Sequence, residues 1–186
     1  MRREHTIAVI IPALNEAPSI GRVIDAIPPW VDDVVVADNG STDGTARIAR
    51  AHGARVVDAP RPGYGSACLA AMAALDYPDI VVFLDGDYSD HPEEMHLLVD
   101  PILNREFDFV VGSRVCGNCA PGALTPQARF GNWLATLLIK IIWGVPYTDL
   151  GPFRAIRYAT LQQLGMRDPD YGWTVEMQIK AALQGV

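Results

Sequence analysis

The sequence is poor in cysteine and lacks the glycine-rich signatures of two common nucleotide-binding loops. Only three of its 186 residues are cysteine, an odd number in a chain long enough to bury a core without cross-links. Both features argue against a secreted disulfide framework and predict a cytoplasmic location. Neither Gly-x-Gly-x-x-Gly nor Gly-x-x-x-x-Gly-Lys-Ser/Thr occurs, which argues against a dinucleotide-binding loop and a P-loop.

Positive charge is also scarce. The chain has 15 Lys and Arg against 22 Asp and Glu, for a net charge of -7 at pH 7. Such a surface repels the phosphates that dominate binding to DNA and RNA, so no nucleic-acid partner is predicted.

Long apolar runs are missing as well. The run Leu134–Trp143 contains Lys140 and is well below the ~18–20 residues that span a bilayer. We predict a buried helix here, and the alternative is a helix that makes peripheral contact with the inner face of a membrane. The run Thr6–Pro12 follows basic residues, but it is too short for a signal peptide and has no small-residue cleavage site, so it is predicted as a buried strand.

What the sequence does contain is the composition and pattern of a folded α/β domain. Hydrophobic residues make up 49% of the chain and charged residues 20%, and no linker divides residues 1–186, so a single domain is predicted. Apolar runs alternate with helix-like segments, which predicts parallel strands with crossover helices. The predicted strands are Thr6–Ile11, Val34–Ala37, Arg55–Asp58, Ile80–Leu84 and Phe109–Val111, and the predicted helices are Ser19–Ile27, Thr42–His52, Ser66–Leu75 and Pro92–Asn104.

Polar residues and glycines follow four of these strands. Because ligands bind beyond the carboxyl ends of the strands of an open parallel sheet, we expect a ligand site at that rim. Asp85-Gly86-Asp87 places two hard oxygen donors two residues apart, which suits Mg²⁺ or Mn²⁺ bound together with substrate phosphates. Gly63 and Gly65 precede a predicted helix; they either form a turn or let backbone amides approach a phosphate or sugar.

With these residues in place, nearly all of residues 6–186 resembles the family 2 glycosyltransferases of the GT-A fold. The branch it resembles most includes dolichyl-phosphate mannose synthases and polyprenyl-phosphate sugar transferases. The resemblance rests on the segments 12–16, 38–45 and 85–87 in the same order. It implies a Rossmann-like αβα sandwich with a mostly parallel sheet, in which Asp85 and Asp87 hold the metal and act in catalysis. The nucleotide-binding residues that it implies are Pro12, Ala13, Leu14, Glu16, Asp38, Gly65, Asp85 and Gly86.

Later segments also match this family. Arg114 and Arg129 lie where the polyprenyl-phosphate branch places arginines on the acceptor phosphate, a role suited to a guanidinium group, although a surface arginine is the alternative. Segment 149–154 resembles the acceptor-side strand, and segment 171–176 resembles a helix whose acidic residue faces the sugar. Glu176 and then Asp149 are therefore the candidates for a general base. Trp173 is predicted either to bind the acceptor or to lie in the core.

The sequence departs from the family pattern at three places. Asn39 stands where relatives have a second Asp, which keeps hydrogen bonding but loses a charge, and Ser89 stands where relatives often have Gln. The chain stops at Val186, whereas relatives usually continue into a segment that can supply a metal-binding His, so we expect a C-terminal segment to be absent. An unpaired sheet edge left by that stop would favour a homodimer.

The predicted reaction is transfer of a hexose from a nucleoside diphosphate sugar, with inversion and with Mg²⁺ or Mn²⁺. The preferred acceptor is a polyprenyl-phosphate lipid. The alternatives are a soluble transferase acting on a hydroxyl acceptor such as a glycerate derivative or polysaccharide, a nucleotidyltransferase, and a catalytically incomplete nucleotide-sugar-binding module. Cys116 and Cys119 supply only half of a tetrahedral zinc site and are predicted to be loop thiols, while Cys68 is predicted to be in the core.

Overall fold

A six-stranded, mostly parallel sheet forms the centre of the computed structural model, which describes residues 2, 4–115 and 126–186, with backbone only for residues 126–129. The strand order is β3-β2-β1-β4-β6-β5. Strand β6 runs antiparallel to both of its neighbours, and the other pairs in the sheet are parallel. The strands are β1 Ile7–Ala13, β2 Asp33–Asp38, β3 Arg55–Asp58, β4 Ile80–Phe83, β5 Phe109–Val111 and β6 Arg154–Arg157.

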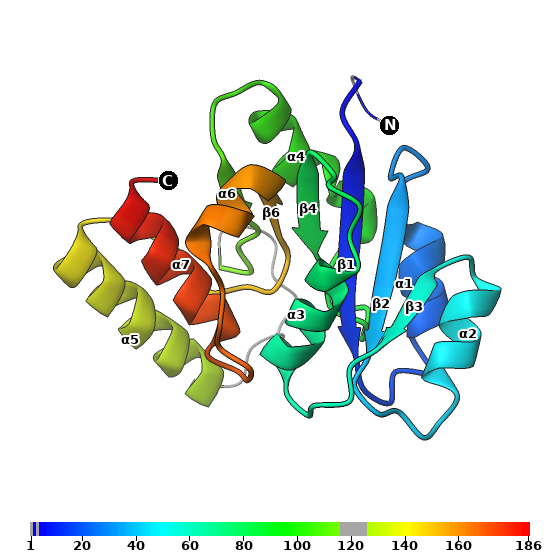
Figure 1. Cartoon of the computed structure of the whole chain (residues 1–186). Helices are drawn as coiled ribbons and strands as arrows, with labels where there is room; N and C mark the ends of the chain where they lie inside the picture. The colour runs from blue at the N-terminus through cyan, green and yellow to red at the C-terminus, as the bar shows by residue number, and fades with distance from the viewer. Residues whose placement is uncertain (1, 3, 116–125) are drawn as a thin grey trace.

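Helices cover both faces of this sheet (Figure 1). The core on one face contains side chains of α1 (Ile20–Ala26), α2 (Thr45–Ala51) and α4 (His96–Leu103), with the 3₁₀ turn η1 (Pro92–Glu94) before α4. The core on the other face contains side chains of α3 (Tyr64–Ala73), α6 (Tyr158–Leu164) and α7 (Trp173–Gln184). The central strands β1 and β4 are buried along their whole length, as expected for a sheet covered on both faces. The predicted αβα sandwich is confirmed.

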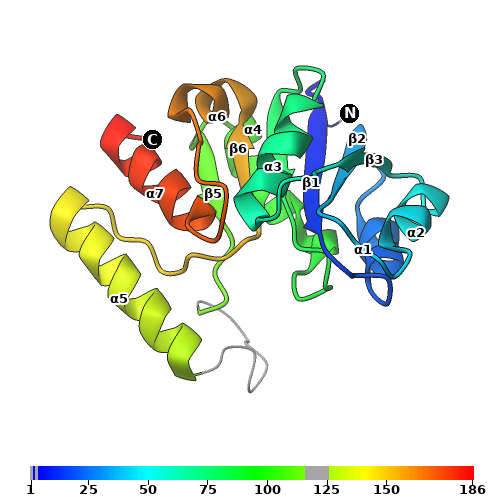
Figure 2. The ribbon, with the colours of Figure 1, turned by 60° about the horizontal axis from the view of Figure 1, so that its bottom comes forward.

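Helix α5 (Pro126–Trp143) differs from the prediction of a buried helix, which is wrong. It lies beside α7 and away from the sheet (Figure 2). Of its described side chains, Thr136 and Ile139 are buried, because α7 covers only one side of the helix. Its exposed large apolar side chains are Phe130, Trp133, Leu134, Leu138, Ile141 and Ile142. Among the described residues, no helix is long and apolar enough to cross a membrane.

Strand β6 begins later than the sequence suggested. The segment predicted as a strand, residues 149–154, is mostly a loop, and only Arg154 of that segment belongs to β6. Arg154 is 1% exposed, and its guanidinium group donates hydrogen bonds to the carbonyl oxygens of Leu150, Gly151 and Thr174. These hydrogen bonds, rather than strand pairing, fix the position of the loop. Cys68 is buried, as predicted, whereas Cys116 and Cys119 lie outside the described residues.

Candidate functional site

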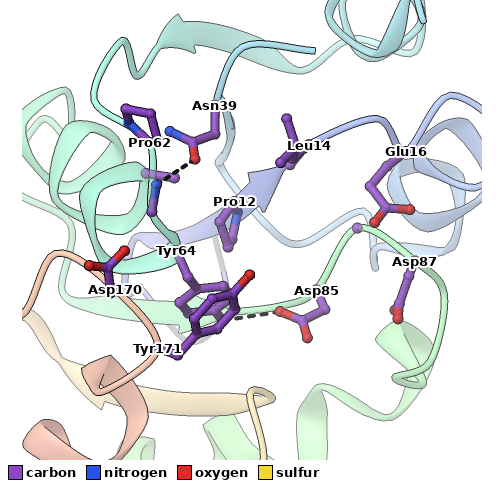
Figure 3. Close-up of a pocket in the computed structure, with 14 residues that line it drawn as sticks. Pro12, Leu14, Glu16, Asn39, Pro62, Tyr64, Asp85, Asp87, Asp170 and Tyr171 are labelled. Carbon is purple, nitrogen blue, oxygen red and sulfur yellow. Dashed lines mark hydrogen bonds between the residues drawn. The ribbon is translucent and has the colours of Figure 1, made fainter. Parts of the chain in front are cut away.

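A cavity of about 510 Å³ lies at the carboxyl ends of β1, β2 and β4 (Figure 3). This is the rim where the sequence placed a ligand site. Of the residues predicted to bind a nucleotide, those that line the cavity are Pro12, Ala13, Leu14, Glu16, Asp85 and Gly86. The further lining residues are Asn39, Pro62, Gly63, Tyr64, Ala67, Asp87, Asp170 and Tyr171.

The segment after β2 supports the loop after β1. The backbone N–H of Thr42 donates to the Asn15 side-chain oxygen at 2.9 Å, and the backbone N–H of Glu16 donates to the Thr45 hydroxyl at 2.8 Å. Asp38 is outside the cavity lining, and its carboxylate accepts the backbone N–H of Ser41 at 3.0 Å. Segment 38–45 therefore holds the loop that presents Leu14 and Glu16 to the cavity.

Asn39 connects the same segment to the loop between β3 and α3. Its Nδ2 donates to the carbonyl oxygens of Ala59 at 2.9 Å and Arg61 at 2.7 Å, and its Oδ1 accepts the backbone N–H of Gly63 at 2.9 Å. A carboxylate can only accept hydrogen bonds. An Asn side chain can therefore make all three hydrogen bonds, whereas an Asp carboxylate cannot donate to the two carbonyl oxygens.

We expect Asn39→Asp to weaken the binding of a nucleoside diphosphate by about tenfold, because the carboxylate would face two carbonyl oxygens and displace the wall formed by Pro62 and Gly63. Calorimetric titration measures this loss. Asn39→Ala removes the same bonds without adding a charge, so it should bind the nucleotide more tightly than Asn39→Asp does. Equal affinity of Asn39→Asp and the unchanged chain would contradict the assigned contacts.

Gly65 does not present its amide to the cavity, so the alternative in which this amide approaches a phosphate or sugar is not supported. Its backbone N–H donates to the carbonyl oxygen of Asp170 at 3.3 Å, and that of Ser66 donates to the carbonyl oxygen of Pro169 at 2.8 Å. A Cβ added to Gly65 would lie 2.0 Å from the carbonyl oxygen of Asp168. The glycine is therefore required for close approach of two backbone segments, the second of which, residues 168–170, could not be located from the sequence.

The carboxyl groups of Asp85 and Asp90 interact after β4. Asp85 accepts a hydrogen bond from the Tyr64 hydroxyl at 3.0 Å (Figure 3), and its backbone N–H donates to the carboxylate of Asp90 at 3.2 Å. Burial, with a contribution from Asp90, raises the pKa of Asp85 to about 7. Burial also raises the pKa of Asp90 to about 6. Sequence reasoning missed Asp90, although it comes three residues after Asp87 and directly after the noted Ser89.

The donor set fits a divalent cation that also binds a diphosphate. Asp85 and Asp87 line the cavity, and their oxygens are the hard ligands that Mg²⁺ and Mn²⁺ prefer. Among residues 2, 4–115 and 126–186, no three His, Cys, Asp or Glu side chains form a metal-binding cluster.

The raised pKa values predict that, without divalent ions, stability falls as the pH rises. Both carboxyl groups hold their protons more tightly in the folded chain than their ordinary pKa of 3.8 implies, so the folded state binds more protons and loses stability as the pH rises through the window between the ordinary and the raised values. In EDTA, the thermal unfolding midpoint should fall as the pH rises from about 5 to about 7. Mn²⁺ should restore it at the upper end, and Asp85→Asn should flatten the profile. A midpoint that rises across this window in EDTA would refute the assignment.

Arg114 and Asp149 form an ion pair at the end of β5. The guanidinium Nε and Nη2 donate to the two carboxylate oxygens of Asp149, each at 2.9 Å. The Asp149 side chain is fully buried, while that of Arg114 is 38% exposed. Although burial opposes it, the hydrogen bonds from Arg114 lower the pKa of Asp149. Asp149 therefore acts here as the orienting partner of Arg114; the side chain of Arg129 lies outside the described residues.

The remaining predicted site residues lie at the start of α7. Trp173 is 1% exposed and packs against Phe83, with ring centroids 6.1 Å apart. It belongs to the core, and its prediction as an acceptor-binding residue is wrong, because the first turn of α7 directs the ring toward the sheet. Glu176 is absent from the cavity lining, and its carboxylate accepts backbone N–H groups of Arg167 and Asp168.

Comparison with known proteins identifies the family. The model of "Glycosyl transferase family 2" matches residues 8–165. An uncharacterised glycosyltransferase of Mycobacterium tuberculosis is 38% identical over 181 residues, covering 96% of this chain and 80% of that protein. Glycosyltransferase AglJ of Haloferax volcanii is 31% identical, covering 97% of this chain and 59% of that protein.

A second group of relatives has a named activity. Glucosyl-3-phosphoglycerate synthase of Mycobacterium tuberculosis is 46% identical over 114 residues, covering 54% of this chain and 35% of the synthase. A crystal structure of that synthase with Mn²⁺, UDP-glucose and phosphoglyceric acid superposes with a TM-score of 0.77 at 32% identity, covering 97% of this chain and 66% of the synthase chain. The predicted GT-A fold is thereby confirmed.

Proposed function

This chain belongs to glycosyl transferase family 2, and on that premise we propose that it transfers glucose from UDP-glucose to a small phosphorylated hydroxy acid of the phosphoglycerate type. The main observation in support is the likeness to the synthase solved with UDP-glucose, Mn²⁺ and phosphoglyceric acid. The sequence alone favoured a polyprenyl-phosphate acceptor, with the glycerate derivative as the alternative. The synthase relatives support that alternative better.

The donor would occupy the cavity at the strand ends. Pro12, Leu14 and Glu16 would surround the nucleoside, and Asp85 and Asp87 would hold a Mn²⁺ or Mg²⁺ ion at the diphosphate. Such an ion would stabilise negative charge on the leaving diphosphate. Tyr64 keeps its proton, because burial and the nearby Asp85 raise its pKa well above the ordinary value. It therefore fixes the orientation of Asp85 by donating a hydrogen bond.

The acceptor would be recognised by its phosphate. Arg114 has a partly exposed guanidinium group whose orientation is set by the buried Asp149. A guanidinium group held in this way suits a phosphate oxygen, because it presents several N–H donors in one plane. We assign phosphate binding to Arg114, with Asp149 as its positioning partner.

Product analysis tests this function. The chain is incubated with UDP-glucose, Mn²⁺ and 3-phosphoglycerate, and the products are identified by mass spectrometry. The proposal predicts UDP and a glucosylated acid in equal amounts, and none of either in EDTA. Pyrophosphate among the products would instead indicate a nucleotidyltransferase, and nucleotide binding without turnover would indicate a binding module. Inversion at the anomeric carbon stays a prediction, which NMR of the product tests.

The exposed face of α5 favours a second candidate, a lipid-phosphate acceptor. The exposed apolar side chains of this helix recur at a spacing of three and four residues, and such a face can lie in the headgroup region of a bilayer. We expect a polyprenyl-phosphate transferase to sediment with anionic lipid vesicles, and the double variant Trp133→Ser with Ile141→Ser to lose this binding. If the unchanged chain does not sediment with the vesicles and transfers no sugar to polyprenyl phosphate, this second candidate is wrong.

A further inference from the structure

The loop between α6 and α7, residues 165–172, forms one edge of the donor cavity. Asp170 and Tyr171 both line the cavity (Figure 3), and the Tyr171 side chain is 86% exposed. An exposed aromatic ring beside a substrate cavity contacts a sugar or a phosphorylated acid at a lower entropic cost when its loop is already held in position. The position of this loop is therefore relevant to the proposed transfer.

The chain fixes the loop from two sides. On one side, the first turn of α3 binds the carbonyl oxygens of Pro169 and Asp170 through two backbone amides. On the other side, the carboxylate of Glu176 on α7 binds the loop amides. Glu176 Oε2 accepts the backbone N–H of Asp168 at 2.8 Å, and the backbone N–H of Arg167 lies 3.1 Å from each carboxylate oxygen.

Two further contacts complete this arrangement. The ammonium group of Lys180, one turn further along α7, lies 2.7 Å from Glu176 Oε1. Within the loop, the carboxylate of Asp168 accepts the backbone N–H of Asp170 at 2.8 Å. Glu176 therefore contacts Asp168, and Asp168 in turn contacts Asp170, which lines the cavity together with Tyr171.

We infer that Glu176 is a positioning residue, whose carboxylate holds the 167–171 loop so that Asp170 and Tyr171 stay at the edge of the donor cavity. This inference rests on the proposed glucosyl transfer and replaces the prediction of Glu176 as the general base. Both of its oxygens already accept hydrogen bonds from the chain, and neither lines the cavity where an acceptor hydroxyl would lie. A general base must reach the proton that it removes.

The charge state of Glu176 agrees with this role. Burial opposes ionisation, but the hydrogen bond from Lys180 and those from the backbone of Asp168 and Arg167 outweigh it and lower the pKa of Glu176. Carboxylates with a low pKa hold N–H donors well and remove protons poorly.

The test compares three single variants and one double variant. Glu176→Gln keeps the size of the side chain but can accept the loop amides through one oxygen only. We therefore expect kcat/KM to fall about three- to tenfold. The fall should come from a higher KM, and the pH profile should be unaltered. Lys180→Met is the comparison variant. It removes the ion pair and the hydrogen bond from Lys180 to the carbonyl oxygen of Gly165 at 2.6 Å but leaves the amide contacts of Glu176, so its activity should fall less than that of Glu176→Gln. Tyr171→Ala removes the ring, and combining it with Glu176→Gln should add no further loss.

Two results would overturn the inference. One is a loss of about 100-fold or more in kcat for Glu176→Gln with KM unchanged, which is the behaviour of a general base. The other is a fully additive loss in the double variant.

Hydrogen exchange keeps the inference separate from the proposed function. It is measured on the free protein, with no substrate. The amides of Arg167 and Asp168 should exchange faster in Glu176→Gln than in the unchanged chain and in Lys180→Met, and equal exchange would overturn the inference. If the unchanged chain transfers no glucose, the proposed function fails, while this result still decides whether Glu176 holds the loop.

Discussion

Asp87→Asn is expected to lower kcat/KM for glucosyl transfer by about 10²- to 10³-fold, the largest effect that we predict. Asp87 lines the cavity, and one of its carboxylate oxygens accepts the backbone N–H of Ser89 at 2.9 Å. Asn can keep that hydrogen bond but loses the charge that attracts a divalent ion. The loss should therefore come with a raised Mn²⁺ requirement, measured by titrating Mn²⁺ at fixed UDP-glucose.

Asp76→Asn provides the control for this variant. Asp76 is exposed and outside the cavity lining, so its substitution changes the net charge equally without touching the site. It should leave both activity and the Mn²⁺ requirement unchanged. Turnover of Asp87→Asn with an unchanged dependence on Mn²⁺ would refute the metal role of Asp87.

The second large effect is expected for Arg114→Lys, which should raise the KM for phosphoglycerate on the order of 10- to 100-fold while UDP affinity stays the same. Lysine keeps the charge but has no planar fork, so it cannot pair with both oxygens of Asp149 and with a phosphate. Steady-state kinetics with varied acceptor, together with UDP titration, separate the two effects.

Arg50→Lys is the matched control, because Arg50 is exposed on α2. A second check is an acceptor without a phosphate group. The unchanged chain should use glycerate much less well than phosphoglycerate, and Arg114→Lys should remove most of that preference. If both forms of the chain prefer phosphoglycerate equally, Arg114 does not bind the phosphate.

Much of the sheet and half of the cavity could be predicted from the sequence. Strands such as β3 and β5 occupy the predicted residues, because a short apolar run between helical segments has few other conformations in an α/β domain. Pro12, Leu14 and Asp85 line the cavity as predicted, because parallel strands bring their carboxyl ends to one rim. The apolar pattern did not locate β6, because its two arginines interrupt that pattern, and the family resemblance placed this strand too early, at residues 149–154.

The contacts that could not be predicted depend on segments far apart in the sequence. The loop between α6 and α7 is one example. Gly65 of α3 closely approaches residues 168–170 of this loop, and Glu176 of α7 forms hydrogen bonds with the same loop. The sequence left open whether Trp173 binds the acceptor or lies in the core. Only the packing of α7 on the sheet decides between these two positions. The exposure of α5 could not be predicted for a similar reason. Its apolar residues predict a buried helix, but only α7 covers it.

Calorimetric titration with UDP, in Mn²⁺ and in EDTA, tests most directly the claim that the rim of β1, β2 and β4 is a metal-dependent donor site. We predict that UDP binds at least about tenfold more tightly in Mn²⁺ than in EDTA, and that GDP and dTDP bind more weakly than UDP. Binding of UDP that is absent, or equally strong with and without the metal ion, would contradict the account.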